Sequence, residues 1–200
     1  MCIIIKSNAI TDNIKEMVKN AWGSNPHGAG IAVKHSDNTL VYVKGLMKLE
    51  TLQQTLNTIN NPKITEVVIH LRFTTHGATN QENCHPYIVK GDETALVGEA
   101  EELFFHNGII GRVNMVNKMR SDTYNAMLHA KNIGIDLAKA LRFYKETNEM
   151  AWDKFVVMYN NKETELIGDF VQVDKNTIAS NKTYIKHSYR SYQEMFLNDI

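Results

Sequence analysis

Short apolar runs recur along the chain at lengths typical of β-strands. They are rich in valine, isoleucine, tyrosine and phenylalanine, which are enriched in strands. The runs read "CIIIK" at 2–6, "GAGIAVKH" at 28–35, "TLVYVKG" at 39–45, "TEVVIHLRF" at 65–73, "TALVGEA" at 94–100, "LFFHNG" at 103–108, "KFVVMYN" at 154–160 and "ETELIGDFV" at 163–171. Several are apolar at nearly every position, which predicts strands that are covered on both faces.

Helical periodicity is concentrated in three other segments. They span 11–20, 48–59 and 121–146. In the first, Ile14, Met17 and Val18 fall on one side of a helix, and Thr11 or Asp12 can cap its first turn. The predicted order is hairpin-like strands, then a block of helices after position 120, then further strands. This segregation favours an α+β fold with largely antiparallel sheets over alternating βαβ units.

The length of the chain fits one domain. Its 200 residues can bury a substantial core without disulfides or a structural metal. There is no internal repeat and no low-complexity tract, and the three prolines do not mark a linker. We therefore expect a single domain over 1–200.

The charge of the chain is balanced. Lysine plus arginine and aspartate plus glutamate each total 22, so no electrostatic footprint for nucleic acid or an anionic membrane is present. No segment approaches the ~20 apolar residues of a membrane span, and the first residues do not have the pattern of a secretory leader. We expect a soluble, cytoplasmic protein whose partners are small molecules or proteins.

Metal-binding side-chain types cluster between positions 70 and 85, but their spacing is irregular. The candidates are His70, His76, Cys84 and His85. They form no pair of cysteines separated by two residues and no histidine pair on one helical face. The only other cysteine is Cys2, which leaves too few for a disulfide framework. We expect no metal and no cofactor.

The densest polar stretch is "HLRFTTHGATNQENCHPY", which follows an apolar strand. Arg72 lies near the end of that strand, where its guanidinium either reaches solvent or holds a carboxylate. Thr75, His76 and Gly77 then form a turn, which is either an ordinary loop or the wall of a ligand site that glycine lets the backbone approach.

Two further stretches each allow a structural and a chemical interpretation. In "LFFHNGII", Asn107 and Gly108 are first of all a hairpin-turn signal, but an asparagine amide and a glycine N–H can also stabilise an oxyanion. In "RSDTYNAM", Ser121 or Asp122 is typical of a helix cap, and a carboxylate there can equally face an ammonium group. Cys2 alone is most simply a buried thiol.

The order of these pieces is more informative than any one of them. Along the chain stand Cys2, "NPHGAGIAV", "RFTTHG", "NCHP", "HNGII" and "SDT". This series resembles the class II glutamine amidotransferases, which are N-terminal-nucleophile hydrolases, and the similarity runs through most of the chain. The resemblance implies a four-layer αββα sandwich of two mainly antiparallel sheets.

The same resemblance implies roles for individual residues. Cys2 becomes the first residue after methionine removal and is the nucleophile, while Asn107 and Gly108 form the oxyanion hole. Arg72 holds the α-carboxylate of glutamine, and Asp122 holds its α-amino group. The remaining pocket residues that it implies are Thr75, His76, His85 and, as a wall, Phe73. A free α-amine with a pKa near 8 can serve as the general base, so no histidine relay is needed.

The chain departs from the family pattern in two places. Ile3 stands where relatives usually have glycine soon after the cysteine, and His27 replaces an acidic residue in "NPHGAGIAV". We expect a stand-alone glutaminase that hydrolyses L-glutamine and supplies ammonia to a separate synthase or ligase. The alternatives are an N-terminal cysteine hydrolase of another amide, with Cys84 beside His85 as a rival nucleophile, and a non-catalytic ligand-binding or scaffolding relative.

Overall fold

The computed structural model describes residues 1–110, 116–147 and 152–185. The helices are α1 (Asp12–Trp22), α2 (Leu49–Ile59), α3 (Asp122–Asn132) and α4 (Leu137–Thr147), with a 3-10 turn, η1, at Gln81–Asn83. The strands are β1 (Ile3–Ser7), β2 (Ala29–His35), β3 (Leu40–Leu46), β4 (Ile64–Leu71), β5 (Tyr87–Ile88), β6 (Val97–Glu99), β7 (Glu102–Asn107), β8 (Lys154–Tyr159), β9 (Glu165–Ile167), β10 (Val171–Asp174) and β11 (Thr177–Ala179). No helix among these is long and apolar enough to cross a membrane.

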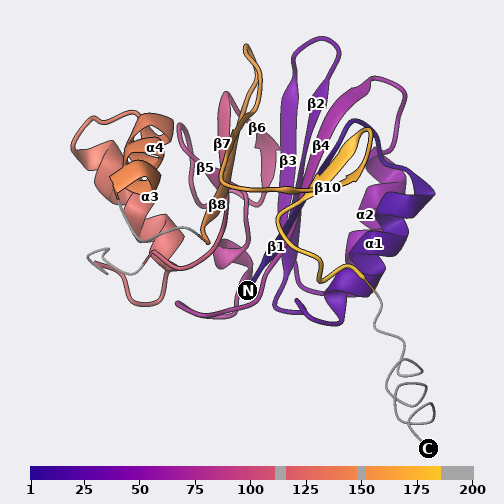
Figure 1. Ribbon diagram of the computed structural model, residues 1–200, viewed down its shortest axis with the longest axis horizontal. Helices are drawn as coiled ribbons and strands as arrows, with labels where there is room; N and C mark the ends of the chain where they lie inside the picture. The colour runs from indigo at the N-terminus through magenta and orange to yellow at the C-terminus, as the bar shows by residue number, and fades with distance from the viewer. Residues whose placement is uncertain (111–115, 148–151, 186–200) are drawn as a thin grey trace, which may run out of the picture.

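Two antiparallel sheets stack face to face between two pairs of helices (Figure 1). The larger sheet has the order β10-β11-β1-β4-β2-β3-β6, and the smaller has the order β5-β7-β8-β9. Helices α1 and α2 cover the outer face of the larger sheet, and α3 and α4 cover the outer face of the smaller one. The predicted four-layer αββα sandwich is therefore confirmed.

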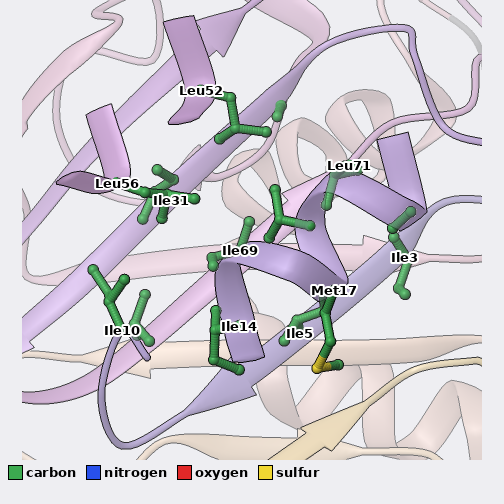
Figure 2. Close-up of a cluster of buried hydrophobic side chains, with 14 of the residues drawn as sticks. Ile3, Ile5, Ile10, Ile14, Met17, Ile31, Leu52, Leu56, Ile69 and Leu71 are labelled. Atoms are coloured by element: carbon green, nitrogen blue, oxygen red, sulfur yellow. The ribbon is translucent and has the colours of Figure 1, made fainter. Parts of the chain in front are cut away.

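Each interface between neighbouring layers has its own apolar core. Ile3 and Ile5 of β1 pack toward α1 with Ile14 and Met17 (Figure 2). Ile4, between them in sequence, points the other way into the core between the two sheets, as the two-residue period of a strand requires. The run of three isoleucines therefore reflects burial on both faces. A third core lies between the smaller sheet and α3 and α4.

Side-chain caps begin two of the helices, and a glycine separates α3 from α4. Thr11 accepts a hydrogen bond from Ile14 N at 3.3 Å and caps α1, as predicted. Ser121 caps α3 in the same way. The predicted helical stretch 121–146 is divided into α3 and α4, because Gly134 has φ +68°. That left-handed conformation ends a helix and suits glycine.

Glycine at position 30 makes room on the inner face of the larger sheet. Lys44, Gly30 and His70 pair across β3, β2 and β4. The backbone of His85 occupies the space above Gly30, where an added Cβ would lie only 1.9 Å from His85 O. The segment that carries His85 is thus held against the sheet at a point where no side chain fits.

Replacing Gly30 with alanine should therefore destabilise the protein by about 1–3 kcal/mol, as overpacking of a filled core does. The matched control is Gly23→Ala, because Gly23 has helical dihedrals and its nearest neighbour to an added Cβ is 3.4 Å away. Urea unfolding of the two variants measures the difference. Equal midpoints would show that the His85 segment is not held in this way.

Candidate functional site

Cys2 lies just before β1, a strand in the interior of the larger sheet. Because Ile3 pairs with Leu71, the residues that follow β4 lie beside the cysteine. Cys2 Sγ accepts a hydrogen bond from Phe73 N at 3.3 Å and lies 3.5 Å from Phe73 O. Burial raises the pKa of the Cys2 thiol above its ordinary value, and the Phe73 N–H opposes that shift. The thiol is therefore held mainly protonated at neutral pH.

Arg72 is buried and organises the loop that follows β4. Its Nη1 donates to Ala78 O at 2.8 Å and its Nη2 donates to His76 O at 2.9 Å. The positive charge of Arg72 also lowers the pKa of the Cys2 thiol, although by less than burial raises it. The guanidinium thus lies close enough to the cysteine for its charge to act on the thiol. Two of its five N–H groups are used by the loop.

The remaining loop residues face outward. Phe73 is 39% exposed and stacks on His27 with ring centroids 5.2 Å apart. His27 Nδ1 also accepts a hydrogen bond from Thr74 N at 2.9 Å. His27 thus supports the loop backbone. Thr75 and His76 are exposed on the same loop, so their predicted place in a pocket stays a prediction.

Asp122 begins α3 and is buried. Its Oδ2 accepts a hydrogen bond from Ile110 N at 2.7 Å. Its negative charge also raises the pKa of the Cys2 thiol, but by much less than burial does. Either Ser121 or Asp122 was expected to cap α3, and the side chain that does so is Ser121.

Asn107 ends β7 and its side chain is buried. Asn107 Nδ2 donates to Ser180 Oγ at 2.9 Å. The other atom of the amide, Oδ1, is also buried and has no hydrogen-bond partner among the residues that the structure describes. The acceptor of the amide is therefore unpaired within the described residues.

A buried histidine–aspartate pair lies directly beside Gly108. His106 Nε2 lies 2.7 Å from Asp153 Oδ1, and His106 Nδ1 lies 2.8 Å from Thr123 Oγ1. A Cβ added to Gly108 would be 1.5 Å from Asp153 Oδ1, so only glycine fits. The network connects the end of β7 to the start of α3, where Asp122 lies. The sequence carries no motif that singles out Asp153.

His85 is buried between the sheets and away from solvent. Its ring lies 4.0 Å from that of His70 and 4.7 Å from that of Tyr87, centroid to centroid. Burial lowers the pKa of His70 to about 3 and lowers that of His85 well below its ordinary value, so both rings are neutral at pH 7. In the described part of the chain, no group of three histidine, cysteine or acidic residues could hold a metal ion.

A segment after β11 fixes the start of the chain. Asn181 Nδ2 donates to Cys2 O at 2.7 Å, and Asn25 Nδ2 donates to Met1 O at 2.6 Å. Thr183 Oγ1 donates to Asn25 Oδ1 at 3.2 Å. The backbone on both sides of the Met1–Cys2 bond is therefore held by amide side chains, none of which had a signal in the sequence.

The structure brings most of the predicted catalytic and binding residues to one end of the sandwich, although their roles stay predictions. Cys2, Phe73, Arg72 and Asp122 interact through contact or charge. Asn107 is joined to the same strand, because Ser180 Oγ also accepts a hydrogen bond from Ile4 N at 2.8 Å. Cys84, the rival nucleophile, is fully buried and its pKa is raised by burial.

The raised pKa predicts a high-pH profile for alkylation of Cys2. Thiolate is the reactive form, so in protein that keeps Met1, confirmed by intact mass, the rate of reaction with iodoacetamide should reach half its maximum at a higher pH than that of glutathione. A Cys2→Ser variant serves as the control for labelling at Cys84. A midpoint at or below that of glutathione would contradict the inferred effect of burial.

Two known enzymes are similar in sequence to part of this chain. No family model matches the chain. It is 35% identical over 82 residues to the glutamine–fructose-6-phosphate aminotransferase of Corynebacterium diphtheriae, which aligns 41% of this chain with 12% of that protein. It is 30% identical over 125 residues to the same enzyme of Vibrio cholerae, which aligns 61% of this chain with 19% of that protein. The chain thus spans less than a fifth of either relative.

Solved structures share the fold over nearly the whole chain. Glutamine phosphoribosylpyrophosphate amidotransferase from B. subtilis, complexed with ADP and GMP, superposes with a TM-score of 0.61 at 17% identity, covering 92% of this chain and 42% of that one. The allosteric regulatory enzyme of purine biosynthesis gives a TM-score of 0.58 at the same identity and coverage. In sequence the chain is thus similar to two glutamine–fructose-6-phosphate aminotransferases, and in fold it is similar to a glutamine phosphoribosylpyrophosphate amidotransferase.

Proposed function

We propose that this chain hydrolyses L-glutamine to glutamate and ammonia through a thioester on Cys2, once Met1 has been removed. The observation that carries the proposal is the position of the Cys2 thiol. It lies at the start of a fully packed strand, in contact with Phe73 and within the electrostatic reach of Arg72 and Asp122. The thiol therefore has a fixed position near one positively charged group, Arg72, and one negatively charged group, Asp122.

In the proposed reaction the Cys2 sulfur attacks the side-chain carbonyl carbon of glutamine. The freed α-amine of Cys2 takes the thiol proton and returns it to the departing nitrogen, so the C–N bond breaks and ammonia leaves. Water then attacks the thioester, the C–S bond breaks, and glutamate is released. Because burial raises the pKa of the Cys2 thiol, a nearby base is needed to generate the thiolate at neutral pH.

Asn107 and Gly108 supply the proposed oxyanion hole. The negative charge that develops on the carbonyl oxygen needs N–H donors that are already fixed in place. Gly108 is fixed by the His106–Asp153 pair, against which no side chain fits. Asn107 is fixed through Ser180.

The proposed pocket holds the amino-acid head group at both ends. Arg72 keeps three N–H donors after the two that hold its loop, which suffices for a paired contact with a carboxylate. Asp122 keeps acceptor capacity beyond its bond from Ile110 N. The remaining proposed lining is Phe73, Thr75 and His76 on the loop, with His85 packed behind the site.

We further propose that the ammonia passes to a separate synthase or ligase in the cytoplasm. In support, the regions shared with the two aminotransferases cover only 12% and 19% of those proteins. Most of each of those enzymes therefore lies outside the matched region.

Removal of Met1 provides the most direct test of the proposed function. With Met1 in place the Cys2 nitrogen is an amide and cannot act as a base. Untagged protein should show the mass of a chain that begins at Cys2 and should release ammonia from glutamine, whereas an uncleavable N-terminal extension should remove turnover without unfolding the protein. Cys2→Ala should also be inactive, and Cys84→Ala should remain active.

The outcomes of that test separate the candidate functions. Glutaminase activity in protein proven to retain Met1 would refute the mechanism and direct attention to Cys84. Covalent labelling of Cys2 by a glutamine-like electrophile, without glutamine turnover, would favour a hydrolase of another amide. Binding of glutamine without labelling or turnover would favour a non-catalytic relative.

Asp122→Asn should impair capture of the ammonium group while it keeps an oxygen for Ile110 N. We expect kcat/KM for glutamine to fall by about 30- to 1,000-fold, equivalent to about 2–4 kcal/mol, mainly through KM. The slow hydrolysis of glutarate monoamide, which has no amine, should be nearly unchanged. Asp136→Asn is the control, because Asp136 is an exposed aspartate that accepts a hydrogen bond from Lys139 N at the start of α4. Equal losses on both amides would refute the assignment of Asp122.

A further inference from the structure

Ser180 connects the strand of the nucleophile to the residue proposed for the oxyanion hole. Its backbone N donates to Ile4 O at 2.8 Å, and Ile4 N donates to its side-chain Oγ at 2.8 Å. The hydroxyl therefore takes the place of a ladder carbonyl at the end of β11. The same Oγ accepts a hydrogen bond from Asn107 Nδ2 at 2.9 Å, across 73 residues of sequence.

Counting donors and acceptors shows that this arrangement is incomplete. Ser180 Oγ accepts two hydrogen bonds, so its single hydroxyl hydrogen is still available to donate. Asn107 Oδ1 is buried without a partner in the described ranges, which is costly for an amide oxygen. The Ser180 hydroxyl hydrogen lacks an acceptor and Asn107 Oδ1 lacks a donor, although the two side chains are already in contact. Both side chains are 1% exposed, so bulk water does not relieve the mismatch.

A half-turn of the Asn107 amide about its last side-chain bond pairs its oxygen with the hydroxyl hydrogen and leaves Nδ2, in place of Oδ1, as the unpaired atom. Oδ1 then takes the position of Nδ2 and accepts the Ser180 hydroxyl hydrogen, while Ile4 N continues to donate to Oγ. Nδ2 takes the buried position that Oδ1 holds, with both its hydrogens available. The amide then presents a donor where it previously presented an acceptor. An oxyanion needs a donor there and is repelled by an amide oxygen.

We propose that Ser180 is a positioning residue, which selects the orientation of the Asn107 amide by donating its hydroxyl hydrogen to Oδ1 and so directs Nδ2 toward the substrate oxyanion. The proposal rests on the glutaminase function proposed above. On this proposal Ser180, which directly follows β11, affects the reaction through Asn107 and touches no reacting atom itself.

A purely structural role for Ser180 makes a different prediction. If the hydroxyl served only to satisfy Ile4 N, its loss would shift β1, and with it Cys2, whether or not Asn107 is present. If it acts through Asn107, its loss matters only while the Asn107 amide is there to be oriented. A double-mutant cycle separates the two roles, because effects exerted through one group do not add.

The experiment measures kcat and KM for glutamine in Ser180→Ala, Asn107→Ala and the double variant, each in protein confirmed to begin at Cys2. Ser180→Ala should lower kcat about 10- to 100-fold, with KM within about twofold, since an oxyanion donor acts in the transition state. The double variant should lie within about threefold of Asn107→Ala alone. Alkylation of Cys2 by iodoacetamide, which forms no oxyanion, should keep its wild-type rate in Ser180→Ala.

The matched control is Ser7→Ala. Ser7 is also a buried serine of the β1–β11 pair, and its hydroxyl lies 3.1 Å from Thr177 Oγ1 at the far end of β1. Its loss should leave kcat unchanged even if the melting temperature falls by a similar amount. If Ser180→Ala does not fold, Ser180→Cys replaces it, because a thiol fills the same space but is a weak donor.

Each outcome decides the proposal. Additive losses in the double variant, a rise in KM without a fall in kcat, or slowed alkylation of Cys2 would overturn the positioning role, while the glutaminase function would stand on wild-type turnover. Wild-type kcat in Ser180→Ala would do the same. Absence of turnover in wild-type protein that begins at Cys2 would overturn both, because the role is defined by that reaction.

Discussion

Burial of β1 on both faces is the constraint on which the rest of the site depends. Ile3 and Ile5 face the helices and Ile4 faces the second sheet, and all three are fully buried. Hydrogen bonds to β4 and β11 hold the strand on both edges. A one-residue shift in register would turn each side chain of the strand to the opposite face of the sheet. The polar residues that follow the three isoleucines would then point into a different core. The backbone of Cys2 therefore has a defined position.

The charged groups of the site are buried, and each is stabilised by backbone atoms. Arg72 donates to two loop carbonyls and Asp122 accepts from a backbone N–H. Groups that are held in this way are ordered before any ligand binds, so a ligand that contacted them would lose less free energy on binding. The neutral His70 and His85 behind them add no further charge. The site thus combines one fixed cation, one fixed anion and one protonated thiol.

Local sequence was sufficient to predict the main strands and three helical segments, because hydrophobic period and caps are local properties. It was insufficient where tertiary contacts decide. β5 and β11, of two and three residues, are too short to show a period, and Gly134 divided a continuous helical pattern. The order of short motifs pointed to Cys2, Arg72, Asn107 and Asp122. Asp153 and Ser180 had no signal, since their partners lie 47 and 73 residues away.

The contacts of Ser180 and Asn181 also imply an order in which the site is completed. Cys2 O, Ile4 N and Asn107 Nδ2 all depend on residues near position 180 for their hydrogen bonds. Loop-closure entropy opposes contacts between positions so distant in sequence until the intervening structure has formed. The start of the chain can therefore pair with β4 before β11 is in place, but Cys2 and Asn107 obtain their final orientation only when β11 docks.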